Sequence, residues 1–277
     1  MSEQCPGQRP QRVFGIDFSG AADAGNRIWI AEGTIENDRL RIAVCRRARD
    51  LPESATTRDP CLGALRSFIE AQGPAVVGLD FPFSLPAALV EPDDWEAFVR
   101  SFGQRYATPK AFRQSCRQAA GGAESKRLTD RESQTPFSPY NLRLFRQTYH
   151  GIRDLLAPLV RSAAVCVLPM QPALSDRPWL LEICPASTLK HNGLYAPYKG
   201  RSAKHTQARV RILESIEHGY GLYFPDVAVR DLVVDNPGGD ALDSVIAACA
   251  VARTLHRPDL LRETSKPPYD VEGHVYV

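Results

Sequence analysis

The chain has 277 residues, of which 43% are hydrophobic and 24% are charged. This composition is typical of a globular protein with a substantial core, and it excludes a largely disordered chain. The formal net charge is only +2, so overall charge alone does not indicate a nucleic-acid-binding protein.

The seven cysteines are scattered and include no C-x-x-C pair. This pattern indicates reduced thiols rather than a disulfide framework or a zinc site. No stretch approaches the length of a membrane-spanning helix, and the polar residues 1–12 lack the apolar segment of a secretion signal. We therefore expect a cytoplasmic protein without membrane contact, with a frayed segment over residues 1–12.

Three apolar or alternating segments follow one another with short links near the N-terminus, which predicts an antiparallel meander. A helix and a short apolar strand come next, so the fourth strand is expected to run parallel to its neighbour. The predicted strands are 12–18, 27–35, 39–45 and 75–80, and the predicted helix is 62–71.

Residues 87–160 interrupt this alternation and are predicted to form a basic, mostly helical insertion over one end of the sheet. Helical patterns cover 92–102 and 141–159. Between them, basic residues outnumber acids and alternate with aromatic side chains. This fits either a solvated surface or a flap that contacts phosphates. The basic residues are Arg105, Lys110, Arg113, Arg117, Lys126, Arg127 and Arg131.

The remainder of the chain completes what we expect to be a single domain over 1–277. The last long helix is apolar on nearly all faces, so it should be buried. Asn236 is its predicted N-cap, and Pro237 its first helical residue. The predicted strands are 163–168, 179–184 and a short one within 272–277, and the predicted helices are 185–194, 204–219 and 238–255.

Three of the apolar strands each carry one acid near the C-terminal end, namely Asp17, Asp80 and Glu182. A carboxylate at the rim of a core is costly unless a hydrogen-bond donor or a cation meets it. A turn in which Asp17 caps its own backbone would explain one such residue. Three acids in the same setting form a pattern that a turn preference does not explain.

Asp240 and Asp243 lie three residues apart in the last long helix, which places both carboxylates on one face. The small residues Ser244 and Ala247 continue that face, so this helix can lie close to a sheet. The helix dipole offsets the repulsion by only about 0.3–1 kcal/mol per acid. A buried pair therefore requires a cation, whereas a surface pair would simply cap the helix start.

Together the acids predict a cluster of oxygen ligands without His or Cys. Hard oxygen ligands favour Mg²⁺ or Mn²⁺ over zinc. Two such ions about 3.5–4 Å apart suit an in-line displacement at phosphorus. The candidate catalytic residues are Asp17, Asp80, Glu182, Asp240 and Asp243.

Four motifs resemble those of a known family. They are G-I-D-F-S-G at 15–20, G-L-D-F-P-F-S-L-P at 78–86, L-E-I-C-P-A at 181–186 and D-A-L-D-S-V-I-A-A at 240–248. With the order of predicted elements, they resemble the DUF429 family of predicted ribonuclease H-like nucleases. The last motif is also similar to the terminal helix of RuvC-type Holliday-junction resolvases.

The resemblance implies an α/β fold of the ribonuclease H-like type, with a mixed sheet flanked by helices. It also implies that Asp17, Asp80 and the pair Asp240/Asp243 bind metal. The leading hypothesis is a metal-dependent nuclease. Asp17 bridges the ions, Asp80 and Asp243 each bind one ion, and Asp240 and Glu182 are outer ligands or the base. Further candidates for substrate contacts are Ser19, Lys126, Arg127, Lys199, Arg201 and Lys204.

Two other functions are compatible with parts of the pattern. In an ATP-dependent phosphotransferase of the actin/sugar-kinase type, residues 17–20 would form the first phosphate loop. That fold needs a second Gly-rich loop, for which 236–239 is the nearest candidate. A non-catalytic nucleic-acid-binding module would leave the converging carboxylates uncompensated, which argues against it. The sequence leaves DNA, RNA and the oligomeric state open, with a homodimer among the options.

Overall fold

The structure is a computed structural model that describes residues 10–91, 94–263 and 266–277. Most of the predicted frayed segment, residues 1–9, lies outside the described residues. The same is true of residues 92–93, where we predicted the start of a helix. No helix within the described residues combines the length and hydrophobicity needed to cross a bilayer.

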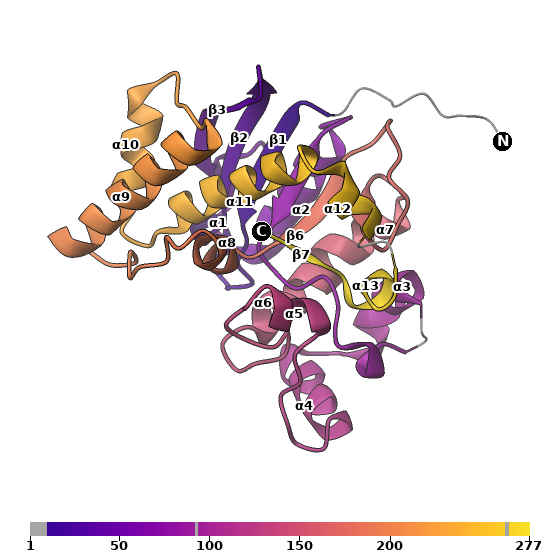
Figure 1. The fold of residues 1–277 in the computed structure, drawn as a ribbon. Helices are drawn as coiled ribbons and strands as arrows, with labels where there is room; N and C mark the ends of the chain where they lie inside the picture. The colour runs from indigo at the N-terminus through magenta and orange to yellow at the C-terminus, as the bar shows by residue number, and fades with distance from the viewer. Residues whose placement is uncertain (1–9, 92–93, 264–265) are drawn as a thin grey trace.

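A mixed sheet organises the fold, with helices on both faces (Figure 1). Its order is β3-β2-β1-β4-β6-β5, and β7 also pairs with β6. Strands β1, β2 and β3 are antiparallel, whereas β4, β6, β5 and β7 continue the sheet in parallel from β1. This confirms the predicted ribonuclease H-like arrangement. The strands are β1 Arg12–Asp17, β2 Trp29–Glu36, β3 Arg39–Arg47, β4 Val76–Leu79, β5 Cys166–Leu168, β6 Trp179–Ile183 and β7 Val275–Tyr276.

Helices α1 and α2 precede β4, and the insertion contributes the helices from α3 to α7. Short 3₁₀ turns occur at η1 Ala48–Asp50 and η2 Ala87–Leu89. The predicted helix 141–159 forms as α6, a π-helical turn η3 and α7. The helices are α1 Ala24–Arg27, α2 Arg58–Glu70, α3 Trp95–Arg105, α4 Pro109–Ala119, α5 Leu128–Glu132, α6 Phe145–His150, η3 Gly151–Leu156 and α7 Ala157–Arg161.

The C-terminal half contributes the helices on the other side of the sheet and a helical pair near the end of the chain. Helices α10, α12 and α13 were not predicted from the sequence. The helices are α8 Pro185–His191, α9 Ala203–Tyr220, α10 Val227–Asp235, α11 Asp240–Leu255, α12 Pro258–Glu263 and α13 Tyr269–Glu272. In Figure 1, α4, α5 and α6 of the insertion lie together beyond one end of the sheet.

Alternate residues of β1 divide the hydrophobic core into two layers. Phe14 and Ile16 belong to the layer that contains α2 and the insertion, whereas Val13 belongs to the layer beneath α11. Gly15 also lies on the α11 side. A Cβ atom at Gly15 would lie 2.0 Å from the carbonyl oxygen of Ser244. The predicted close approach of the small-residue face of this helix to the sheet is therefore confirmed.

The start of α11 corrects one prediction. Its N-cap is Gly239, with φ of 78°, and not Asn236. Glycine adopts this left-handed conformation without the strain that a Cβ atom would add. Asn236 still contributes, because its side-chain oxygen accepts a hydrogen bond from the Ala241 amide at 3.4 Å. A Cβ atom at Gly239 would lie 2.8 Å from the Tyr198 ring, so glycine also lets the loop before α9 approach the helix start.

Candidate metal centre

Asp17 and Asp80 end two neighbouring strands. Asp17 is the last residue of β1, and Asp80 directly follows β4. Ile16 is paired with Leu79 in the parallel register, so the two acids emerge side by side. Alternation with Gly15 places Asp17 on the face that α11 covers. Asp17 is only 9% exposed, and Asp80 is half-buried.

Helix α11 contributes the other two acids. Its close packing on β1 brings the buried Asp243 over the end of that strand. Asp240, one turn earlier, keeps about a third of its side chain exposed, at 32%. Strands β1 and β4 and helix α11 therefore bring four carboxylates to one end of the sheet.

The four carboxylates form one electrostatic cluster. Burial, followed by the charges of Asp243 and Asp80, holds the pKa of Asp17 well above its usual range. Burial and then the charge of Asp243 raise the pKa of Asp80 to about 8. Burial also raises the pKa of Asp240, and the Lys199 charge opposes this rise. Like charges that are held together out of water disfavour ionisation in this way.

Two side chains, Tyr198 and Lys199, donate to the carboxylate of Asp243. The Tyr198 hydroxyl donates to Oδ1 of Asp243 at 2.5 Å, and Lys199 Nζ lies 2.6 Å from Oδ2. Lys199 Nζ also lies 3.8 Å from Oδ1 of Asp240. No residue that the structure describes donates a hydrogen bond to the carboxylate of Asp17 or Asp80. Among the described residues, Lys199 is the cation paired with this cluster, and the charges of Arg27 and Arg47 also act on Asp240.

This donor set fits a hard divalent cation in chemical type and in charge. The carboxylates are not, however, preassembled around one. Within the described ranges, no group of three or more His, Cys, Asp or Glu side chains is placed to hold a metal ion. Lys199 Nζ is already paired with Oδ2 of Asp243. A metal ion held by these residues would compete with the ammonium group for Asp243, and the carboxylates would have to move closer together to hold it.

Glu182 lines the same cavity as Asp80, and its charge contributes to the raised pKa of Asp80, but the strand register turns its side chain to the other face of the sheet. Leu79, rather than Asp80, is paired with Glu182, and this offset of one residue directs the Glu182 side chain away from α11. Its carboxylate accepts hydrogen bonds from Arg127 Nη1 and from the Phe83 amide, each at 2.8 Å, and from Arg127 Nη2 at 2.5 Å.

The prediction that Arg127 contacts substrate is wrong. Its side chain is 1% exposed. All five of its N–H donors are occupied by Asp130, Glu182 and the carbonyl oxygen of Glu272. A buried guanidinium group with no free donor cannot reach a phosphate. Arg127 instead holds Glu182 in a buried ionic network.

The other predicted substrate contacts lie in different surroundings. Lys126 donates to the carbonyl oxygen of Thr135 at 2.5 Å. The Ser19 hydroxyl accepts a hydrogen bond from the Ala21 amide at 3.3 Å, within the turn after β1. Arg201 and Lys204 are exposed, at the start of α9. Only Lys199 among these candidates reaches the carboxylates.

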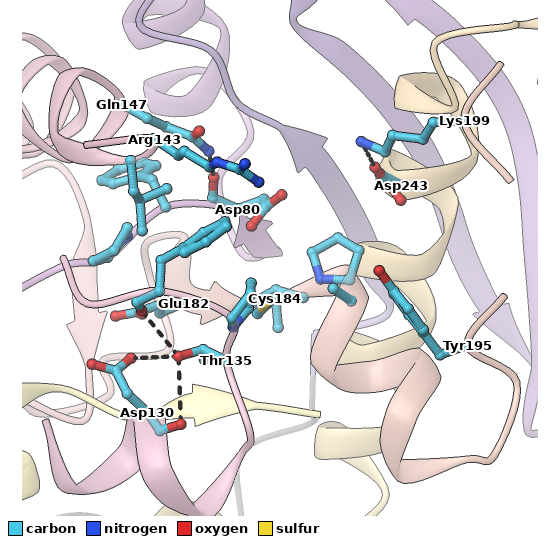
Figure 2. A pocket seen from close by; sticks show the side chains of 18 of the residues that line it. Asp80, Asp130, Thr135, Arg143, Gln147, Glu182, Cys184, Tyr195, Lys199 and Asp243 are labelled. Carbon is cyan, nitrogen blue, oxygen red and sulfur yellow. Dashed lines mark hydrogen bonds and ion pairs between the residues drawn. The ribbon is translucent and has the colours of Figure 1, made fainter. Parts of the chain in front are cut away.

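A cavity of about 450 Å³ opens beside the carboxylates. Figure 2 shows Lys199 and Asp243 on one side of it, with Asp80, Arg143 and Gln147 on the other. Sequence reasoning missed Arg143, Gln147 and Tyr198, because nothing in the local pattern distinguishes them from ordinary loop and helix residues. Cys184 also lines the cavity, and burial, with the charge of Asp80, raises the pKa of its thiol to about 12.

A scan against protein-family models gives no match for this chain, and a search of curated proteins gives none either. Among solved structures, the yeast mitochondrial Holliday junction resolvase Ydc2 is similar, with a TM-score of 0.41 and 11% identity. The match covers 93% of this chain and 88% of that chain. At this score the likeness supports no argument, so the fold assignment rests on the order and directions of the strands.

Proposed function

We propose that this protein is a divalent-metal-dependent nuclease that hydrolyses phosphodiester bonds in nucleic acid. The observation that carries the proposal is that Asp17, Asp80 and Asp243 lie at one end of the sheet, where burial and then the charges of neighbouring acids raise the pKa of Asp17 and of Asp80, with Asp240 beside them. Such an arrangement is costly in a fold, and strongly perturbed carboxyl groups cluster at functional sites. The motif resemblance to the DUF429 family points to the same class, and membership of that family is part of the proposal.

In this proposal Asp17, Asp80, Asp240 and Asp243 hold Mg²⁺ or Mn²⁺. When bound, the ions supply an activated water and stabilise the leaving oxygen. Asp17 faces the charges of Asp243, Asp80 and Asp240, so it would be the ligand shared between the ions, with these three as the other ligands. Glu182 is assigned a positioning role, because its carboxylate anchors the Phe83 amide in the segment that follows Asp80.

The insertion supplies a surface suited to phosphates. A groove lined by basic side chains from α4 and α6 lies on its outer side. Arg113 is also paired with Glu124, whose carboxylate lies 3.5 Å from its guanidinium group. Such surfaces provide most of the sequence-independent affinity for nucleic acid. We assign it to backbone contacts, with Arg201 and Lys204 as outlying contacts. The basic residues of the groove are Lys110, Arg113, Arg117 and Arg146.

The test is cleavage of labelled single-stranded, duplex and branched DNA and RNA with Mg²⁺, with Mn²⁺ or with EDTA. We expect metal-dependent cleavage that Asp17→Asn abolishes. Asparagine resembles the protonated acid that burial favours, so circular dichroism and the melting temperature of this variant should match the wild type. Asp176→Asn, which alters an acid with 70% of its side chain exposed, is the matched control and should cleave normally.

Each alternative function gives a different result. Absence of cleavage with either metal on every substrate would refute the nuclease. Salt-dependent binding without turnover or metal dependence would instead identify a non-catalytic module. Stabilisation by ATP without cleavage would favour the phosphotransferase. A cytoplasmic location is part of the proposal, since the cysteines that the structure describes are all free thiols, as in reducing compartments.

A further inference from the structure

We infer that the cavity beside the carboxylates binds one unstacked nucleobase, so that the substrate is a strand with unpaired nucleotides. This inference rests on the proposed function for the position of the scissile phosphate. It concerns the walls of the cavity, however, and not the metal chemistry. Nothing in the four carboxylates themselves requires a cavity of this size or an aromatic lining.

The size and shape of the cavity fit a base. Its volume of about 450 Å³ lies within the range of about 300–1,000 Å³ found for small-molecule sites. The insertion contributes Phe137 and Leu144 to its lining, and the loop after α8 contributes Tyr195. In Figure 2, Tyr195 lies on the side of the cavity opposite Arg143 and Gln147.

The two aromatic rings are available for stacking. Tyr195 is 55% exposed, and Phe137 is half-buried, so neither ring is fully used by the core. Every base presents a π-face, and stacking on an aromatic ring is therefore tolerant of sequence. A cavity with rings from two separate segments can hold a flat heterocycle between them or against either one.

A cationic side chain lies near each of these rings. The guanidinium carbon of Arg143 lies 5.6 Å from the centroid of the Phe137 ring. Lys190 Nζ lies 5.7 Å from that of Tyr195. A ring paired with a cation suits a nucleotide, because the ring stacks on the base while the cation meets a phosphate.

The position of the cavity relates the base to the reaction. Asp80, Asp243 and Lys199 line the same cavity as the rings, so a base in it places its own phosphate near the carboxylates. A base enters such a site only after it leaves its stack, at a cost of a few kcal/mol that is smallest for unpaired nucleotides. The geometry therefore favours single-stranded, bulged or branched substrates over a continuous duplex.

The test measures binding in EDTA, so that cleavage does not interfere. Fluorescence anisotropy compares fluorescein-labelled single-stranded DNA and RNA with a fully paired duplex of the same sequence. We expect tighter binding of the single strands. Tyr195→Ala and Phe137→Ala should each weaken it by roughly 5- to 150-fold, since base–aromatic stacking contributes about 1–3 kcal/mol. Tyr195→Phe should retain wild-type affinity.

Tyr223→Ala is the matched control. Tyr223 also pairs its ring with a cation, the guanidinium group of Arg39 at 4.6 Å, but it lies against the opposite edge strand, β3. Its replacement should leave binding unchanged. A single strand that is abasic at every position should bind the wild type no more tightly than the intact strand binds Tyr195→Ala.

Several results would overturn the inference. They are unchanged single-strand binding in both alanine variants, equal or tighter binding of the paired duplex, and Tyr195-dependent binding of free AMP without binding of oligonucleotides. If the protein cleaves a fully paired duplex and Tyr195→Ala does not alter this cleavage, the inference is refuted and the proposed nuclease activity is supported. If single strands bind through Tyr195 and Phe137 but are not cleaved in Mg²⁺, the inference is supported and the proposed nuclease activity is refuted.

Discussion

Lys199 Nζ lies 2.6 Å from Oδ2 of Asp243, so a lysine whose side chain is half exposed is paired with a buried carboxylate. The lysine belongs to the loop before α9, and its stem lies against Gly239, where a Cβ atom would lie 3.0 Å from Lys199 Cγ. Water reaches one end of this ion pair, since 53% of the lysine side chain is exposed. A cation from solution can therefore compete with the ammonium group for the same oxygen.

Replacing Lys199 should strengthen metal binding. In Lys199→Gln the neutral side chain no longer competes for Asp243, while the mutual repulsion of the carboxylates remains. We expect a lower melting temperature than the wild type in EDTA, and a larger rise on addition of Mg²⁺ or Mn²⁺. Lys204→Gln, at an exposed position in α9, is the control. An unchanged metal-dependent shift in Lys199→Gln would contradict the competition.

Stability without metal should depend on the pH through Asp80. Burial and Asp243 raise its pKa from 3.8 to about 8, so the folded state binds a proton that the unfolded chain releases. The stabilisation is fully present below the unfolded pKa and is lost as the pH rises through about 8. Metal affinity should rise over the same interval, because the ligands must lose their protons.

The measurement is urea-induced unfolding in EDTA across this pH range, for the wild type and for Asp80→Asn. The variant carries no titrating carboxyl group at this position. Between pH 4 and pH 8, the unfolding free energy of the wild type should therefore fall relative to that of Asp80→Asn. A difference that is constant with pH would show that Asp80 titrates normally.

The basic groove of the insertion should determine the salt dependence of nucleic-acid binding. Lys110→Glu and Arg117→Glu should weaken binding uniformly across sequences, because phosphate contacts carry no sequence information. Each replacement should also reduce the slope of log affinity against log salt by about 1. Arg257→Glu, beyond the end of α11, serves as the control. An unaltered slope in both groove variants would assign the groove to a merely solvated surface.

The buried network of Arg127 should be essential for stability. Arg127→Ala leaves Asp130 and Glu182 buried without their cation, and we expect a loss of about 3–5 kcal/mol of unfolding free energy. Arg127→Lys keeps the charge but cannot form five directed bonds, so its loss should be intermediate. Arg105→Ala breaks an ion pair with Glu91 whose side chain is 73% exposed, and it should cost less than about 1 kcal/mol. Chemical denaturation distinguishes these outcomes.

The packing of α11 on β1 should not tolerate a methyl group. In Gly15→Ala the new Cβ would lie 2.3 Å from the Ala248 amide nitrogen, so the helix must move off the strand. We expect a loss of about 3 kcal/mol or more, at the top of the usual range for overpacking. At Gly63 in α2 the nearest atom, in the flexible Arg66 side chain, would be 3.7 Å away. Gly63→Ala should therefore stabilise by about 0.5–1 kcal/mol, from its higher helix propensity.

The sequence determined the elements and the order in which they are used. Period-2 and helical patterns located the meander, the strand carrying Asp80 and the buried helix of Asp243, because these patterns reflect local side-chain spacing. The expectation that Asp17, Asp80 and Asp243 lie at one end of the sheet also came from the sequence. Parallel strands place their C-terminal ends at one edge of a sheet. The spacing of three residues between Asp240 and Asp243 places both carboxylates on one face of the helix.

Only the tertiary structure decided which acids face helix α11 and which face the insertion. Glu182 resembled Asp17 and Asp80 in its local pattern, yet it is paired with Leu79, and its side chain meets Arg127 across the sheet from α11. No local pattern encodes this, because a shift of one residue between strands distant in the chain reverses the face of a side chain. The same holds for Lys199 and Tyr198, whose loop meets α11 only through long-range packing at Gly239.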